Sequence, residues 1–224
     1  MGSSAEQRAT KLREAYRERV ARNGVRLSPL WARPCRAYNV QIELDPRARA
    51  SLKKTQRVLE RAEPSLLVCP QDTLHVSVAW LLAVHAHYPA PKDHLWGRHG
   101  EGWTAELYRI AAESAAFRIA YGRVVATDSA VVALAEPIGP VNRIRKVIRE
   151  RLRLPAETRN EADLVHTTLF RFGGPLSDPE AFLATLEETR AEAEAEVGEL
   201  VVAKELVYPS LESEVLARLP LARR

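Results

Sequence analysis

The chain has 224 residues, of which 46% are hydrophobic and 28% charged, so it is long enough to fold around one sizeable core or two small lobes. Lys and Arg number 33 against 29 Asp and Glu, and a net charge of +4 permits an anionic ligand without requiring one. The apolar runs are far shorter than the ~20 residues that cross a bilayer, and residues 1–24 lack the apolar segment of a secretory signal, so a cytoplasmic protein without a membrane anchor is expected. The two cysteines, Cys35 and Cys69, have no metal-ligand spacing and are expected to be free thiols.

The first half of the chain alternates helical and extended patterns. A helix rich in charged residues has only a thin apolar stripe and ends at Asn23-Gly24, which is typical of a surface helix. Asp45-Pro46 then begins a second helix, and Pro64 ends it. A stretch with two prolines and three glycines is predicted to be a loop of roughly 18 residues. The predicted elements are a helix at 5–22, a strand at 36–44, a helix at 46–62, a strand at 74–84 and the loop at 85–102.

The second half contains pairs of strands joined by short turns. This order favours antiparallel sheets in an α+β fold over a doubly wound parallel sheet. Arginine and lysine side chains on the outer face of residues 143–153, Arg145 among them, are predicted to form a solvated helix surface. The predicted elements are a helix at 103–114, strands at 116–126 and 129–136, helices at 141–152 and from 177 through 196, and strands at 164–172, 199–208 and 214–219.

Two copies of a short pattern are the main functional signal. His75-Val76-Ser77 and His166-Thr167-Thr168 each lie in an apolar run that is predicted to be a strand. Side chains at i and i+2 of a strand share one face, so each copy offers an imidazole beside a hydroxyl. By the same alternation Ala79 and Leu81 share the face of His75 while Trp80 lies on the opposite face. Arg171 would face away from His166 unless a β-bulge or the end of the strand redirects it.

These motifs resemble those of the 2H phosphoesterase superfamily, which includes the 2′-5′ RNA ligase-like and 2′,3′-cyclic phosphodiesterase proteins. The family motif is H-x-[S/T]-hydrophobic, and both copies fit it, at 75–78 and 166–169. The resemblance covers roughly residues 36–210 and implies two pseudo-symmetric lobes, with antiparallel sheets lining a central cleft and helices on the outer faces. Residues 1–35 are then an N-terminal extension with a surface helix, and residues 36–224 a single two-lobed domain.

The resemblance also implies a function. It predicts a monomeric, metal-independent phosphodiesterase that hydrolyses a 2′,3′-cyclic phosphate, or a related phosphodiester, on an RNA end or a nucleotide without a cofactor. His75 and His166 would act as acid and base, and Ser77, Thr168 and Arg171 would hold the phosphate. Which histidine is the acid, and whether hydrolysis or ligation is favoured, stays open.

Two other functions are compatible with the sequence. Four histidines, His85, His87, His94 and His99, fall in the predicted loop and could bind zinc or nickel in a metal-dependent hydrolase, although they lack the spacing of a known zinc motif. The chain could also be an RNA-binding protein with little turnover. For an RNA or nucleotide ligand, Tyr88 and Trp96 are candidates for base stacking.

Overall fold

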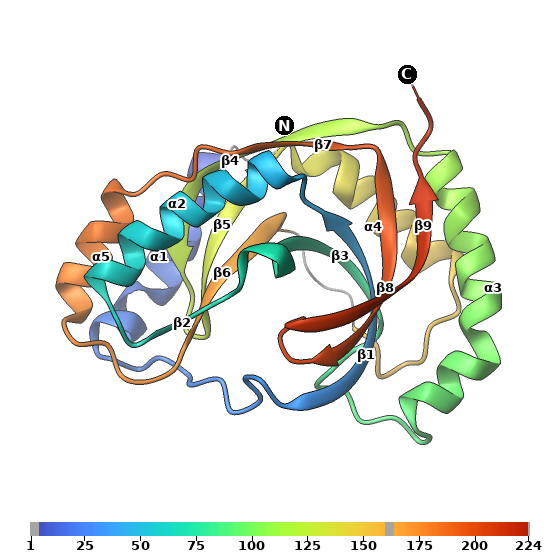
Figure 1. Ribbon diagram of the computed structural model, residues 1–224, viewed down its shortest axis with the longest axis horizontal. Helices are drawn as coiled ribbons and strands as arrows, with labels where there is room; N and C mark the ends of the chain where they lie inside the picture. Colours follow the sequence, from blue (N-terminus) through green and yellow to red (C-terminus); the bar gives the residue numbers. More distant parts are fainter. Residues whose placement is uncertain (1–4, 160–163, 224) are drawn as a thin grey trace.

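The computed structural model describes residues 5–159 and 164–223, which form two antiparallel sheets flanked by helices (Figure 1). The helices are α1 Ala5–Ala21, α2 Pro46–Ala62, α3 Lys92–Ala112, α4 Ile138–Arg151 and α5 Pro179–Glu188, with a short 3-10 helix at Gln71–Thr73. The strands are β1 Pro34–Glu43, β2 Leu66–Val68, β3 His75–Leu82, β4 Phe117–Ala126, β5 Ala130–Glu136, β6 His166–Phe172, β7 Glu194–Val197, β8 Glu199–Val207 and β9 Glu212–Pro220. The predicted α+β fold with two lobes is confirmed.

Each lobe is built on one sheet. The four-stranded sheet has the order β3-β1-β8-β9 and curls into a half-barrel, with α3 and α4 on its outside. The five-stranded sheet has the order β2-β6-β5-β4-β7. The strands that carry the two motifs, β3 and β6, contact each other where the lobes meet. The fold therefore brings together two segments that are far apart in the sequence.

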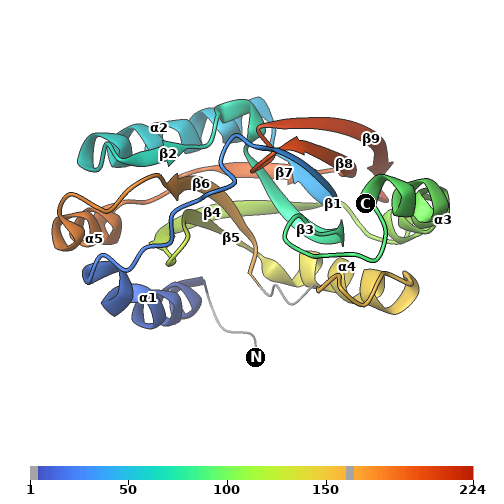
Figure 2. The ribbon, with the colours of Figure 1, turned by 90° about the horizontal axis from the view of Figure 1, so that it is seen from below.

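The five-stranded sheet is covered on both faces. Helix α2 packs on one face and α1 on the other (Figure 2). Ala9, which has no exposed surface, packs with Val132 and Leu134 of β5. These two residues pair with Thr168 and His166 across the ladder, and paired residues share a face. The helix before the family-like region thus covers part of the sheet face that carries the second motif, and it is more deeply packed than its thin apolar stripe suggested.

Two segments differ from the sequence-based expectation. The region predicted to be a loop at 85–102 is helical from Lys92 onward, because α3 runs as one helix from Lys92 to Ala112 and buries Leu95, Trp103 and Leu107. The helix predicted to run from 177 through 196 ends at Glu188, and residues 194–197 form strand β7 beside β4. Among the described helices none is long and apolar enough to cross a membrane.

Candidate active site

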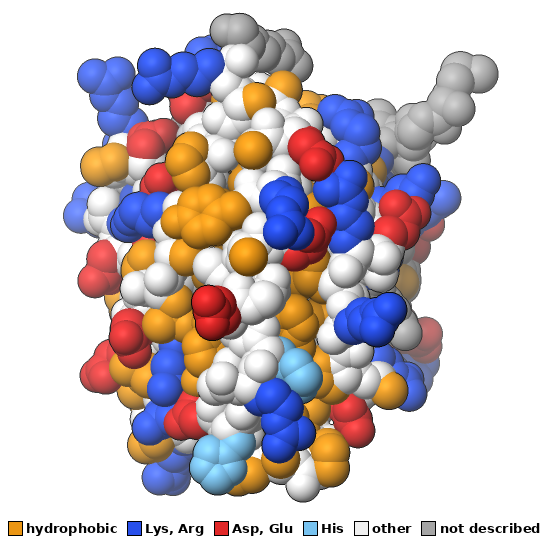
Figure 3. Space-filling view, turned by 90° about the vertical axis from the view of Figure 1, so that its right-hand side faces the viewer, with side chains coloured by type: hydrophobic (Ala, Val, Ile, Leu, Met, Phe, Trp, Pro, Cys, Tyr) orange, Lys and Arg blue, Asp and Glu red, His pale blue; other side chains and the backbone are white. Residues whose placement is uncertain are grey.

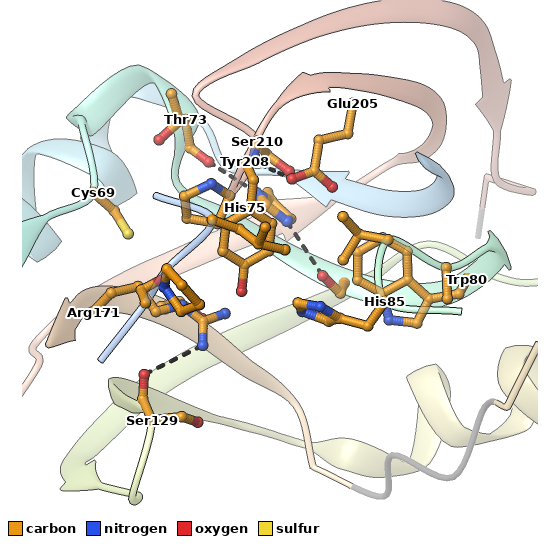
Figure 4. Close-up of a pocket in the computed structure, with 18 of the residues that line it drawn as sticks. Cys69, Thr73, His75, Trp80, His85, Ser129, Arg171, Glu205, Tyr208 and Ser210 are labelled. Atoms are coloured by element: carbon orange, nitrogen blue, oxygen red, sulfur yellow. Dashed lines mark hydrogen bonds between the residues drawn. The ribbon is translucent and has the colours of Figure 1, made fainter. Parts of the chain in front are cut away.

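A cleft with a volume of about 670 Å³ opens where β3 and β6 meet (Figure 4). It contains all five residues that the motifs predicted for catalysis and phosphate binding, together with side chains from the N-terminal segment, the end of β3 and the β8–β9 turn. The lining residues are Arg26, Leu27, Ser28, Pro29, Leu30, Cys69, Thr73, His75, Ser77, Trp80, Ala83, Val84, His85, Ser129, His166, Thr168, Arg171, Glu205, Tyr208, Pro209 and Ser210.

A hydrogen bond ties the two motifs together. Thr167, the central residue of the second motif, is fully buried, and its Oγ1 donates to the carbonyl of His75 over 3.0 Å. Since that donation uses the only hydroxyl proton of Thr167, the buried Tyr121 must donate its own hydroxyl to Thr167 Oγ1 at 2.7 Å. The chain from Tyr121 through Thr167 to His75 therefore fixes the distance between the two motif strands.

Each motif strand carries a β-bulge at the same position of its motif. In β3 the register passes from Gln41↔Ser77 to Val40↔Ala79, which leaves Val78 without a partner residue. In β6 it passes from Val132↔Thr168 to Val131↔Phe170, which leaves Leu169 without one. A bulge reverses the alternation of the side chains that follow it.

Because of the bulges, the residue five positions after each histidine faces the cleft. Arg171 lies on the cleft side with His166, so the bulge at Leu169 provides the redirection that a contact with phosphate needs. Trp80 likewise lines the cleft beside His75, so its predicted placement on the opposite face is wrong. The two motifs therefore present an imidazole, a hydroxyl and a third side chain each, at equivalent positions.

A buried side chain from a helix stabilises each bulge. Arg145 of α4 is only 3% exposed, and it donates from Nε to the carbonyl of Val78 and from Nη2 to that of Ser77, both at 2.9 Å. Gln56 of α2 is fully buried and donates from Nε2 to the carbonyl of Leu169 at 2.9 Å. The expectation that Arg145 lies on a solvated face is wrong, because these unpaired carbonyls need a donor in the interior.

His75 is held in one tautomer. Its Nδ1 lies 2.8 Å from the carbonyl of Thr73, which can only accept, so Nδ1 carries a proton. Its Nε2 then points toward Ser77 Oγ at 3.2 Å. Burial, and to a smaller extent the positive charge of Arg49, lower the pKa of His75, whereas the Thr73 carbonyl and the Glu43 carboxylate act in the opposite direction by favouring the imidazolium.

His166 is held neutral. Its pKa is lowered from 6.5 to about 4, chiefly by burial and then by the positive charges of Arg145 and Arg171 and by His75. Its Nδ1 is buried and has no hydrogen-bond partner among the described residues. Since every one of these influences opposes protonation, His166 is the stronger candidate for a proton acceptor at neutral pH.

Arg171 brings positive charge to the cleft floor. Its guanidinium carbon lies 5.6 Å from the centre of the Tyr208 ring, and Nη1 donates to the carbonyl of Ser129 at 3.4 Å. Figure 4 shows the guanidinium between Tyr208 and Ser129. On the other side of Tyr208 the ring of His85 approaches edge-on, with the ring centres 5.5 Å apart. The aromatic side chains that line the cleft are thus Trp80 and Tyr208.

The residues predicted to stack on a base lie elsewhere. Tyr88 accepts a hydrogen bond from the backbone N–H of Ala83 at 2.7 Å, and Trp96 stacks on Tyr38 with ring centres 4.5 Å apart. Neither lines the cleft, so the base-stacking role predicted for them has no support in the geometry. No local pattern pointed to Tyr208, which reaches the cleft only through the fold of the β8–β9 turn.

The histidine-rich segment does not converge on one point. His85 lines the cleft, whereas His94 and His99 lie on α3, where His99 stacks on Trp103 at 5.3 Å between ring centres. Within residues 5–159 and 164–223, no three His, Cys, Asp or Glu side chains are grouped so that they could hold a metal ion. The predicted zinc or nickel site at these histidines therefore finds no support.

Solved structures with the same fold clarify the class of protein. The chain aligns with TT0787 of Thermus thermophilus at 18% identity and a TM-score of 0.60, over 84% of this chain and 99% of that one. Apo LigT of E. coli aligns at 16% identity and a TM-score of 0.57, over 84% of this chain and 98% of that one. Usb1 of Kluyveromyces marxianus aligns at 12% identity and a TM-score of 0.51, over 84% of this chain and 98% of that one. No known protein-family profile matches the sequence, and no curated protein matches it significantly.

The fold and the cleft together define a two-lobed α+β protein whose paired H-x-[S/T] motifs face each other across the junction of two sheets. The particular fold is that of the 2H phosphoesterase superfamily, to which these three structures belong. These structures therefore support the family resemblance of the sequence at the level of the fold alone.

Proposed function

We propose that the protein is a phosphodiesterase that opens a 2′,3′-cyclic phosphate, or cleaves a related phosphodiester, by acid–base catalysis with two histidines. The observation that carries the proposal is the convergence of His75, Ser77, His166 and Thr168 on one cleft, from two strands joined by the Thr167–His75 hydrogen bond. An imidazole can give or take a proton near neutral pH, and a hydroxyl can donate to a phosphate oxygen.

In the proposed reaction, His166 takes a proton from water while the water oxygen forms a bond to phosphorus. The bond between phosphorus and one ribose oxygen breaks, and His75 gives its Nε2 proton to that oxygen. The product is a phosphomonoester, and both histidines exchange protons with solvent before the next turnover. Ser77 and Thr168 donate to the non-bridging oxygens, and Arg171 stabilises the charge that develops there.

The surroundings of the two histidines support this division of roles. Every charged neighbour of His166 disfavours its protonated form, which suits a base. His75 differs in having a carbonyl at Nδ1 and the Glu43 carboxylate nearby, which favour its imidazolium against the opposing effects of burial and Arg49, so His75 is the better candidate for the acid. The single negative charge of an incoming phosphodiester would favour that protonated form further.

The identity of the substrate rests on analogy. E. coli LigT, which shares this fold, has been solved in complexes with phosphate and with 3′-AMP, at 12% and 13% identity to this chain. A cleft of about 670 Å³ is within the size range of small-ligand sites and has aromatic side chains on its wall. An RNA end or a nucleotide is therefore the substrate class that we propose.

The direct test is hydrolysis of 2′,3′-cyclic mononucleotides and of oligonucleotides ending in a 2′,3′-cyclic phosphate, with and without a chelator. We expect turnover that the chelator does not change, because two imidazoles supply the acid and the base. Activity that is lost on chelation and restored by zinc would instead indicate the metal-dependent hydrolase. Tight oligonucleotide binding without turnover would indicate the RNA-binding protein.

The low pKa of His166 predicts how stability depends on pH. A histidine with a folded pKa of about 4 and an unfolded pKa of 6.5 binds protons more tightly when unfolded, so its contribution is complete above 6.5 and is lost as the pH falls toward 4. At about pH 5 the loss amounts to about 2 kcal/mol. Urea unfolding at about pH 7.5 and pH 5 should show that His166→Gln loses less stability than the wild type. The exposed His87→Gln should behave as the wild type, and equal losses in all three proteins would contradict the prediction.

A further inference from the structure

Helix α2 carries a large excess of positive charge. Its sequence, PRARASLKKTQRVLERA, contains six basic residues against a single acidic one, Glu60. Ala48, Leu52, Gln56 and Leu59 face the interior, so the basic side chains occupy the remaining surface of the helix. Four of them are spaced four residues apart and form a continuous row, the α2 row: Arg49, Lys53, Arg57 and Arg61.

The α2 row has no ion-pair partner among the residues that the structure describes. Within the described part of the chain, no ion pair or side-chain hydrogen bond involves any of its four residues. The other helices differ. In α1, Arg17 pairs with Glu180 and Glu187, and in α4, Arg151 pairs with Glu113. On the α3 side of the molecule acidic and basic side chains are interspersed (Figure 3).

An unpaired row of this kind is unfavourable for the isolated protein. Like charges four residues apart on a helix repel each other and destabilise it. The positions are exposed or half-buried, and packing does not require basic residues there. A polyanion lying along the helix would remove the repulsion and release bound counterions.

The row leads to the candidate active site. Arg49 at its beginning lines a side cavity of about 320 Å³ that also includes Thr73, His75 and Ser210, and these last three residues line the main cleft as well. The Nε of Arg49 is buried and has no partner among the described residues. From Arg49 to Arg61 the row extends ~18 Å along α2. This helix lies over one face of the five-stranded sheet (Figure 2).

We propose that the α2 row binds the phosphates of a single-stranded RNA whose 3′ end occupies the cleft, so that the substrate is an RNA chain rather than a free mononucleotide. This inference rests on the proposed function, because the cleft must hold the reacting phosphate. The chain would leave the cleft through the side cavity at Arg49 and follow Lys53, Arg57 and Arg61.

The test compares two substrates in one triple variant, Lys53→Gln/Arg57→Gln/Arg61→Gln. For an oligonucleotide of about ten residues with a 2′,3′-cyclic phosphate end, we expect KM to rise about 10-fold or more at low salt. The slope of log KM against log salt concentration should fall by about 2, since each single-strand phosphate contact contributes about 0.7. Both kcat/KM and KM for a 2′,3′-cyclic mononucleotide should be unchanged, and the melting temperature should not fall.

A matched control removes the same charge elsewhere. Arg143→Gln/Lys146→Gln/Arg153→Gln changes three exposed cations in or directly after α4 and should leave oligonucleotide kinetics unaltered. Equal effects of both triple variants, or an unchanged KM in the α2 variant, would overturn the proposal. So would binding of the wild type to anionic phospholipid vesicles but not to the oligonucleotide.

Failure of the proposed function gives a different result. In that case neither substrate is turned over by the wild type. Fluorescence anisotropy with a labelled oligonucleotide bearing a 3′-phosphate then still tests the α2 row, since binding should weaken in the α2 variant and not in the α4 variant. Absence of turnover would therefore contradict the proposed function, whereas equal oligonucleotide binding by the two triple variants would contradict the proposal for the α2 row.

Discussion

Alanine at either His75 or His166 is expected to lower kcat for cyclic phosphate hydrolysis by about 10²–10⁴-fold, because each imidazole supplies a proton transfer that the other cannot perform at the same time. The double variant should lose little more than either single variant, since residues that act as one unit are not additive. Steady-state kinetics with a mononucleotide substrate measure both effects.

Two controls separate chemistry from folding. His87→Ala changes an exposed histidine of the same segment that was considered for metal binding, and it should retain wild-type kcat. Near-ultraviolet circular dichroism should show the same tertiary signal for His75→Ala and His166→Ala as for the wild type. If a folded single variant kept the wild-type rate, catalysis by two histidines would be wrong.

Methionine at Arg145 should have the largest effect on stability. The substitution keeps a long side chain but removes two charge-assisted hydrogen bonds to the carbonyls of Ser77 and Val78, at a cost of about 3–5 kcal/mol. It also removes a positive charge that lowers the pKa of His166, so the acidic limb of the kcat/KM profile should move to higher pH. Urea unfolding and the pH profile measure the two effects independently.

Gln56 provides the matched comparison for Arg145. Gln56→Met removes the side-chain donor at the other bulge, where the Leu169 carbonyl also accepts from the backbone N–H of Cys69, and it does not change the charge. Gln56→Met should lower stability but leave the acidic limb of the kcat/KM profile at the same pH. Arg145→Lys should also leave that limb at the same pH, because it retains the charge. A limb that moved equally in Gln56→Met and Arg145→Met would show that Arg145 does not act through its charge.

The sequence by itself determined the two strands and the alternation within each motif, whereas the two lobes were expected from the family resemblance. An imidazole and a hydroxyl two residues apart in a strand must share a face, whatever surrounds the strand. These local rules were sufficient to place His75 with Ser77 and His166 with Thr168.

Prediction from the sequence was wrong where local backbone preference and tertiary packing disagree. Glycines and prolines in residues 85–102 predicted a loop, since a glycine in a helix costs about 1 kcal/mol. The structure offsets that cost by burying Leu95, Trp103 and Leu107 of α3, and Gly100 leaves room for the Trp96 ring, which would lie 2.6 Å from a Cβ at that position. The residues against which α3 packs, and which therefore decide that this segment is helical, are distant in the sequence.

Only the tertiary structure decided what completes the site. Whether Trp80 and Arg171 face the cleft depends on one unpaired residue in each strand, and that residue is tolerated because Arg145 and Gln56 supply donors from helices packed against the bulges. Likewise, residues 26–30 reach the cleft because the backbone N–H groups of Arg26 and Ser28 donate to the carbonyls of Asp128 and Phe172. A strand pattern reports the side-chain alternation of one segment, whereas a bulge is stabilised by hydrogen bonds to residues that no local pattern contains.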